Sequence, residues 1–540
     1  MSCLLDQYLS TIHYITPKLN LIDCERRRVV NYSTMDQTDL EYVALSYVWG
    51  GNSDVSTSIS GGSELPTSLP RVIEDAILVT LSLGYRFLWI DRYCIDQHDA
   101  SNKHEQIMHM DSIYQYAALT IIAAAGTDET YGLPGVSRRR SPSQWSFKGD
   151  GFNITSTLPP PQRSIRESRW ATRGWTYQEA VLSTRRLVFT DDQLYFECNS
   201  MGIYESIQTT RVPISRHPPF EFRNFTTYTR CAEQYSKRIL RFDSDSLNAF
   251  GGIIRRLETA EKSPVYHVWG VPFIDQADGA GDDTLHPRLP LITSSLVPLF
   301  YRGNPLHDPE QTRRIESLMV GLSWCHSTSA VSPRRRAQFP SWSWVGWEGA
   351  AVWPTVPQNS PVQGLKLKSM LFSPEINATT WLEEDSMKSL IIPHGSHART
   401  TEGPTTLLYF EDYREEIYET YATPIGLTQL QHPRILCIEA ATMSRNALIL
   451  RDHPQRLCIS SGGGVNLYPS KHGLDAVRVF EGIQGGSYEA IRLATVEASS
   501  YLMLVELDGQ VAYRIGTLVV RGLYLNSRLF KSHVMTYRII

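Results

Sequence analysis

Three short segments carry polar and glycine residues at spacings that could build one ligand site. They are residues 44–50 (ALSYVWG), 89–97 (WIDRYCIDQ) and 173–179 (RGWTYQE). The first two end runs that are typical of buried strands, and open parallel sheets bind ligands at the carboxyl ends of their strands. The third places an amide and a carboxylate in the first turns of a helix. We therefore expect the three segments to meet in one crevice at that edge of a sheet.

The side chains expected at this crevice combine acids, amides, an arginine, a hydroxyl and indoles. They are Ser46, Trp49, Gly50, Asp91, Asp96, Gln97, Arg173, Trp175, Gln178 and Glu179. A structural role competes at several of these positions. Glu179 could instead pair with Arg173 or Arg185 and fasten its own helix, and tryptophans pack in cores by default. Ser46 lacks the Gly-x-Ser-x-Gly context of an activated nucleophile and could simply bond to backbone.

The sequence lacks the motifs of several well-known enzyme classes. It contains no GxxxxGK[ST], no GxGxxG and no GxSxG, which argues against a P-loop NTPase, a Rossmann dehydrogenase and an α/β-hydrolase. Residues 104–109 (HEQIMH) hold two histidines that are five positions apart. A zinc-binding helix needs its two histidines on one face, at a spacing of four. We therefore assign no metal ligand and no cofactor.

The composition is that of an ordinary globular protein, with 42% hydrophobic residues, 20% charged residues and a formal net charge of −4. This charge gives no electrostatic reason to expect nucleic acid or an anionic membrane as a partner. The eight cysteines include no C-x-x-C pair and are too sparse for a disulfide scaffold. The N-terminus lacks the features of a signal peptide, and no apolar stretch approaches the ~20 residues of a membrane helix. We expect a soluble, cytoplasmic protein.

Strand and helix patterns alternate in the N-terminal part of the chain. Apolar runs at 42–48, 86–90 and 119–125 predict buried strands. Amphipathic patterns at 68–84 and 102–117 predict the helices between them, the second opened by a capping box. Such alternation is typical of right-handed βαβ crossovers and a parallel sheet. The predicted class is α/β.

This alternation breaks at residues 127–168, whose Gly, Ser, Pro and Arg content predicts an inserted loop. A helix pattern then follows at 175–182, with strand patterns at 186–190 and 193–198. From these changes we expect an N-terminal extension at 1–40, an α/β domain at 41–200, a helical and Trp/Pro-rich segment at 201–355, and a mostly β region at 356–540.

The three segments named first resemble the heterokaryon incompatibility (HET) domain family, whose pattern reads approximately xALSYxWG, WIDxxCIxQ and RGWTxQE. The order and spacing of the segments match as well. The resemblance covers roughly residues 40–200. It extends more loosely to 230–350, where DSLNAF at 245–250 and PSWSW at 340–344 look like segments that recur in long HET proteins.

This resemblance implies a role in fungal non-self recognition, in which fusion of incompatible partners triggers programmed cell death. It also implies a fold similar to the TIR domain, which is a flavodoxin-like parallel sheet. TIR enzymes carry a helix motif similar to W-C-x-x-E, whose glutamate serves the cleavage of NAD. Residues 175–179 (WTYQE) resemble that motif, with Thr176 in place of the cysteine. By this resemblance Glu179 is the catalytic residue and NAD is the substrate.

Two mechanisms follow from the resemblance. In the first, cleavage of the nicotinamide–ribose bond builds an oxocarbenium-like centre, which a carboxylate can stabilise without a metal. In the second, the domain is a non-catalytic adaptor or self-assembly module. Protein partners or self-association are expected in either case.

Overall fold

The computed structural model divides the chain into two compact units. The first unit holds Met1–Glu221 with Arg238–Leu240 and Asn248–Ile253, and the second unit holds the rest. The residues that the structure describes are 19–31, 41–50, 64–97, 99, 103, 106–140, 144–156, 158–198, 201–206, 225–260, 264–274, 317–327, 333–354, 387–390, 407–411, 435–440, 442–452, 455–460, 464–496, 499–521, 529 and 535–540.

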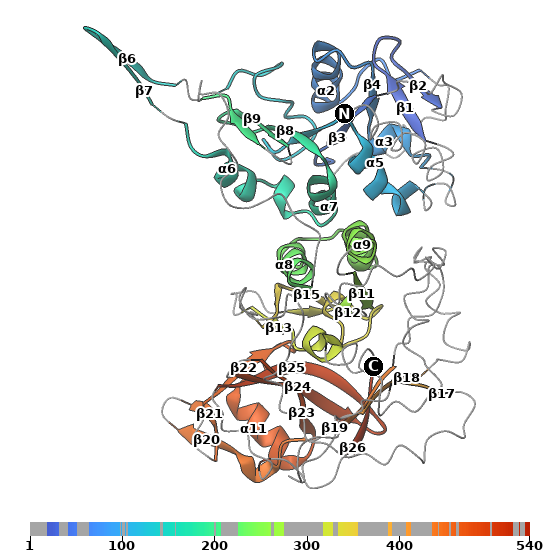
Figure 1. Ribbon diagram of the computed structural model, residues 1–540, viewed down its shortest axis with the longest axis vertical. Helices are drawn as coiled ribbons and strands as arrows, with labels where there is room; N and C mark the ends of the chain where they lie inside the picture. Colours follow the sequence, from blue (N-terminus) through green and yellow to red (C-terminus); the bar gives the residue numbers. More distant parts are fainter. Residues whose placement is uncertain are drawn as a thin grey trace, which may run out of the picture. The chain divides into compact units, whose positions relative to one another are not determined.

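An eight-stranded sheet forms the centre of the first unit, in the order β10-β9-β8-β5-β3-β4-β1-β2 (Figure 1). Its four middle strands are parallel to their neighbours within that group. These are β3 (Tyr42–Ser46), β4 (Phe87–Trp89), β5 (Leu119–Ala123) and β8 (Arg185–Phe189), and the edges are β1 (Asn20–Asp23), β2 (Arg28–Asn31), β9 (Leu194–Cys198) and β10 (Gly202–Tyr204). The expected α/β class with a parallel centre is confirmed.

Both edges of this sheet are antiparallel, which the alternating pattern did not predict. β8 and β9 are joined by only the residues 190–193, and so short a link can form a hairpin but not a parallel crossover. β1 and β2 form a second hairpin that pairs with β4. Residues 20–31, which we expected in an N-terminal extension, are therefore part of the sheet.

The helices of the first unit connect its parallel strands. α2 (Arg71–Ser82) links β3 to β4, and Gly84 follows its C-cap with a φ of 83°, which suits glycine. α5 (Met110–Tyr116) lies between β4 and β5, and the capping box expected at 102–105 lies outside the described residues. These two connections cross the sheet in opposite directions, so right-handed crossovers place α2 and α5 on opposite faces.

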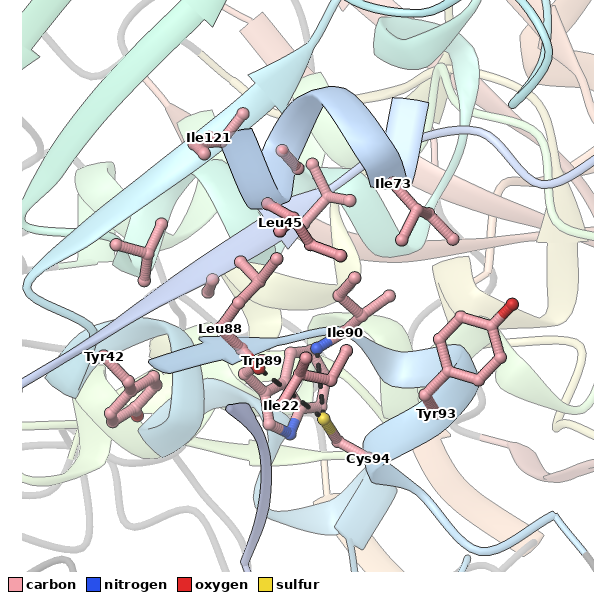
Figure 2. Packing of buried hydrophobic residues seen from close by; sticks show 14 of the residues in the cluster. Ile22, Tyr42, Leu45, Ile73, Leu88, Trp89, Ile90, Tyr93, Cys94 and Ile121 are labelled. Carbon is pink, nitrogen blue, oxygen red and sulfur yellow. Dashed lines mark hydrogen bonds between the residues drawn. The ribbon is translucent and has the colours of Figure 1, made fainter. Parts of the chain in front are cut away.

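The larger of two apolar clusters in this unit joins the sheet to its helices, and the smaller one includes Ile122, Trp170 and Val188. Leu45, Trp89 and Ile121 on neighbouring strands are fully buried, as is Ile73 on α2. Figure 2 shows the Cys94 thiol packed beside β4, where it contacts backbone atoms of Leu88 and Ile90. Burial raises the pKa of Cys94 to about 12, so this thiol acts as a small hydrophobic side chain.

The expected inserted loop contains regular structure. β6 (Ser146–Gly149) and β7 (Phe152–Thr155) form an isolated hairpin, and α6 (Pro161–Glu167) follows. Figure 1 shows this hairpin projecting away from the main sheet of its unit. The segment then returns to the domain through a short 3-10 helix, Trp170–Thr172, and enters α7 (Trp175–Leu182).

The second unit combines helices and small hairpins with a large sheet. Helix α8 (Phe225–Tyr235) precedes α9 (Asp245–Glu258), part of which belongs to the first unit. β-Strands dominate its C-terminal part, as expected, in a sheet ordered β17-β18-β19-β26-β25-β24-β23 with β22 beside β25. The shorter strands of this sheet are β17 (Met387–Leu390), β18 (Leu407–Glu411), β19 (Ile435–Ala440), β22 (Val465–Pro469) and β26 (Met535–Ile539). Its longest strands are β23 (Tyr488–Val496), β24 (Ser499–Asp508) and β25 (Val511–Arg521), covered by helix α11 (Ala476–Gly485) and its apolar core.

None of the helices in the described part of the chain is both long and apolar enough to cross a membrane.

Candidate functional site

Glu179 on α7 is held by a chain of two hydrogen bonds that passes through Ser46 at the end of β3. The Trp170 indole donates to Ser46 Oγ at 2.7 Å, and the Ser46 hydroxyl donates to Glu179 Oε2 at 2.5 Å. Ser46 is the last residue of β3, so the carboxylate lies at the carboxyl end of a central strand. All three side chains are buried, and Glu179 is only 6% exposed. The carboxylate is therefore fixed in direction and largely shielded from water.

This environment makes Glu179 a weak acid. Burial raises its pKa, the Asp91 charge adds to the rise, and the Ser46 hydrogen bond opposes it, which gives a value of about 7. Tyr114 on α5 lowers the pKa of Glu179 slightly, and its hydroxyl donates to Leu45 O at 3.1 Å. A carboxyl that titrates near neutral pH can both accept and release a proton under physiological conditions.

Asp91 forms a second acidic position immediately after β4. Its carboxylate accepts hydrogen bonds from the Trp49 indole, at 3.1 and 3.2 Å, and from the Arg92 backbone N–H at 2.8 Å. Burial raises the pKa of Asp91 to about 6, against the lowering effect of Arg173 and of these hydrogen bonds. Trp49 and Asp91 are half-buried, so this pair is closer to solvent than Glu179 is.

Arg173 supplies the positive charge that acts on both acids. It lowers the pKa of Asp91 and of Glu179, and its guanidinium donates to Tyr47 O at 3.2 Å. Arg185, the other arginine considered as a partner of Glu179, donates to Ala118 O at 3.2 Å. Two weakly acidic carboxyls and one arginine thus share the carboxyl edge of β3 and β4.

An ion pair borders the two acids on the β5 side. Glu129 accepts from the Gly50 backbone N–H at 3.0 Å and pairs with Arg92 at 3.1 Å. The Arg92 guanidinium also lies over the Trp49 ring, 5.2 Å from its centroid. A side chain at Gly50 would approach Glu129 Oε1 to 3.3 Å, so the glycine lets this carboxylate reach the backbone.

Four other residues expected at the crevice have structural contacts instead. Gln97 donates to Asp91 O at 3.3 Å and to Ile95 O, and Asp96 accepts from the Asp99 N–H at 3.4 Å, so both brace the loop after β4. Gln178 Oε1 accepts from the Gly252 N–H at 3.2 Å. Trp175 packs, half-buried, against the main core of its unit.

Sequence reasoning did not select Trp170, Tyr114 or Glu129 for this site. Trp170 precedes RGWTYQE by only three residues, and the R-W-A-T-R-G-W run could have drawn attention to it. Tyr114 lies within the helix expected at 102–117, and its place near Glu179 becomes visible only once α5 is packed beside α7. Glu129 lies in the segment expected to be an irregular loop, and no sequence signal distinguished it.

The arrangement suits the handling of a cationic or electron-poor group near neutral pH. Two carboxyls with raised pKa values influence one another, and such groups are enriched at catalytic sites. Among the residues that the structure describes, no group of three or more His, Cys, Asp or Glu side chains could hold a metal ion. The half-buried indole of Trp49 offers an aromatic surface beside Asp91.

Comparison with known proteins identifies the domain that carries this site. No curated protein and no solved structure matches the chain. The family model described as "Heterokaryon incompatibility protein (HET)" matches residues 42–179, which begin at β3 and end at the glutamate bound by Ser46. The chain therefore contains a heterokaryon incompatibility (HET) domain at residues 42–179.

Proposed function

We propose that this protein is a fungal incompatibility effector whose HET domain cleaves NAD, and that Glu179 is the catalytic residue. The HET domain itself ties the chain to heterokaryon incompatibility in general. The observation that carries the finer proposal is the paired placement of Glu179 and Asp91 at the carboxyl edge of β3 and β4, with pKa values of about 7 and about 6.

The strand order supports a nucleotide at this edge. Numbered along the chain, the parallel strands β4, β3, β5 and β8 have the order 2-1-3-4. Flavodoxin-like sheets share this order and bind their ligand where it reverses, beside the first strand. Ser46 ends that first strand here. The TIR-like, flavodoxin-like assignment of the domain is thus part of the proposal.

The proposed reaction is hydrolysis of the N-glycosidic bond. Nicotinamide leaves with the electron pair of the bond, and positive charge builds at the ribose carbon. The ionised Glu179 carboxylate stabilises that charge, water adds to the carbon, and the released proton passes to a carboxylate. NAD and water thereby give ADP-ribose, nicotinamide and a proton. Trp49 would stack on a ring of the nucleotide, and Asp91 would orient a ribose hydroxyl.

Purified full-length protein tests this proposal directly. NAD and nicotinamide are quantified by chromatography for the wild type, for Glu179→Gln, and for Glu167→Gln as a matched control. Glu167 is exposed on α6, and its one partner among the described residues is Arg163, four positions away. We expect Glu179→Gln to lose at least about a hundredfold in rate with its melting transition intact. Equal rates for the wild type and Glu179→Gln would refute a catalytic role for Glu179.

A second function, self-assembly without catalysis, is favoured by the β6–β7 hairpin. Trp145, Phe147, Phe152 and Ile154 are 79%, 63%, 53% and 60% exposed. Phe147 lies opposite Ile154, and Gly149 lies opposite Phe152, so strand alternation places all four side chains on one face. An isolated two-stranded hairpin is marginally stable in water, and such an apolar face favours association.

For this second function, we propose that the hairpin face packs on the same face of a second copy of the chain. The test is the mass of the wild type and of Phe147→Ser/Ile154→Ser by light scattering over a range of concentrations. Lys148→Ser, on the opposite face of β6, is the matched control. A concentration-dependent dimer that is lost only in the double variant supports the proposal, and a wild type that stays monomeric contradicts it.

A further inference from the structure

A cavity of about 560 Å³ in the second unit lies outside the HET domain. This volume falls within the range of small-molecule sites. The lining residues that bear on its chemistry are Arg334, Arg335, Lys471, Glu506, Tyr513 and Arg514. Four of them are cationic side chains and one is an acid, and Arg334 is already paired with Asp243 and Glu348 at 2.7 Å. The positive charge of the wall therefore comes from the other three cations.

Arg514, on β25, is the most unusual member of this wall. It is 1% exposed, and its hydrogen-bond partners are neutral: Leu322 O and Thr517 Oγ1, both at 2.8 Å, and Trp324 O. The guanidinium also lies 3.8 Å from the centroid of the Trp324 ring. Among the described residues, no carboxylate lies within ion-pair distance of Arg514, and its Nε has no hydrogen-bond partner.

A buried guanidinium without a counter-charge is costly, because burial removes its hydration and no acid replaces it. Burial lowers the pKa of Arg514 to about 9, so the group remains charged at neutral pH. Carbonyl oxygens and an indole face offset only part of this cost. Among the described residues, none compensates the charge of Arg514, which belongs to the wall of the cavity.

Two further cations, Lys471 and Arg335, line the same cavity. Lys471 pairs with Glu506 at 2.7 Å, but both side chains are substantially exposed and can rearrange. Arg335 donates to the Gly346 carbonyl at 2.8 Å, and its guanidinium lies 5.5 Å from the centroid of the Trp347 ring. Tyr513, beside Arg514, is 36% exposed and offers a ring surface at the same cavity.

We propose that this cavity binds a phosphate group of a small molecule, with Lys471 as its direct cationic contact and the buried charge of Arg514 as a second source of attraction. A doubly charged phosphate offsets both of these positive charges at once. This binding site is independent of the proposed NAD cleavage at Glu179, which belongs to the other unit.

Isothermal titration of the full-length protein tests the site. The probes are inorganic phosphate and AMP, with citrate as a carboxylate comparison, all at matched ionic strength. We expect saturable binding of a phosphate-bearing probe that is weakened about ten- to hundredfold in Lys471→Ala, which removes one charged hydrogen bond. Tighter binding of AMP than of phosphate would assign the site to a phosphorylated organic molecule, and equal binding would assign it to the phosphate group alone.

Two further variants keep the test decisive. Lys237→Ala removes an exposed lysine from α8's C-terminal end, away from the cavity wall, and should leave binding unchanged. Arg514→Met keeps the length of the side chain and should abolish binding. If that variant does not fold, Lys471→Ala alone carries the comparison. Failure of the wild type to bind either phosphate probe at millimolar concentration, or equal affinity in Lys471→Ala, would overturn the proposal.

Discussion

The Ser46 hydroxyl donates a 2.5 Å hydrogen bond to the Glu179 carboxylate, which joins the end of β3 to the middle of α7. The two residues are separated by 133 positions in the chain, and both are buried. The same hydroxyl accepts a hydrogen bond from the Trp170 indole N–H, so Ser46 links an aromatic donor to an acid. Substitutions of Ser46 and Glu179 should therefore change both the stability of the domain and the pKa of the acid.

Glu179→Gln should alter the pH dependence of stability. The pKa of Glu179 in the folded state is about 7, above its ordinary value of 4.5, so the protonated form favours folding. Its stabilising effect is complete below about pH 4.5 and is lost as pH rises toward 7. Relative to Glu179→Gln, the wild type should lose about 3 kcal/mol over that window. Denaturant titrations at several pH values measure this difference, with Glu167→Gln as the control; parallel curves for the wild type and Glu179→Gln would contradict it.

Ser46→Ala should destabilise the HET domain by about 2 kcal/mol, because it leaves a buried indole N–H and a buried carboxyl without their shared partner. It should also raise the pKa of Glu179 further, because the lost hydrogen bond favours the ionised form. Any NAD cleavage should then require a higher pH. Thermal melting and a pH–rate profile report the two effects separately, and an unchanged melting temperature would show that the hydrogen bond contributes nothing net.

Trp49→Phe should raise the pKa of Asp91 above about 6, because the indole N–H donates to the ionised carboxylate and phenylalanine cannot. The ring position over which Arg92 lies is kept. Carbon-13 NMR titration of the labelled Asp91 carboxyl measures the shift. A titration midpoint that stays in place or moves to lower pH would contradict this assignment of the hydrogen bond.

Gly126→Ala should be more destabilising than Gly84→Ala. Both glycines have positive φ angles, of 71° and 83°, at which an alanine costs about 1–2 kcal/mol. At Gly84 an added Cβ meets nothing within 4 Å, whereas at Gly126 it would lie 2.2 Å from the Tyr131 ring. The Gly126 variant therefore carries an additional steric cost. Equal losses of unfolding free energy in the two variants would contradict the packing of Tyr131 against this turn.

Local patterns were sufficient for the central elements of the HET domain. The apolar runs that became β3, β4 and β5 are buried on both faces, so their composition alone distinguishes them from the amphipathic helix α2. The sequence also predicted that Ser46, Asp91 and Glu179 lie near one another. Parallel strands bring their carboxyl ends to one edge of the sheet, and α7 returns to that edge.

The edges of the domain required the tertiary structure. The hairpins β1–β2 and β8–β9 are antiparallel because their links are short, yet no residue in them carries a parallel or antiparallel preference of its own. The β6–β7 hairpin was hidden in a segment whose Gly and Pro content is typical of loops. Its apolar face conflicts with the usual expectation that inserted loops are polar.

The sequence by itself determined the HET domain, its α/β alternation and the residue types at the site, because these depend on local composition and spacing. Only the tertiary structure decided which side chains touch. It paired Ser46 with Glu179 and Trp49 with Asp91, and it directed Gln178 toward Gly252. Burial, which results from packing by the whole unit, then raised the pKa values of the two acids. Desolvation depends on every surrounding atom, so no short motif can specify it.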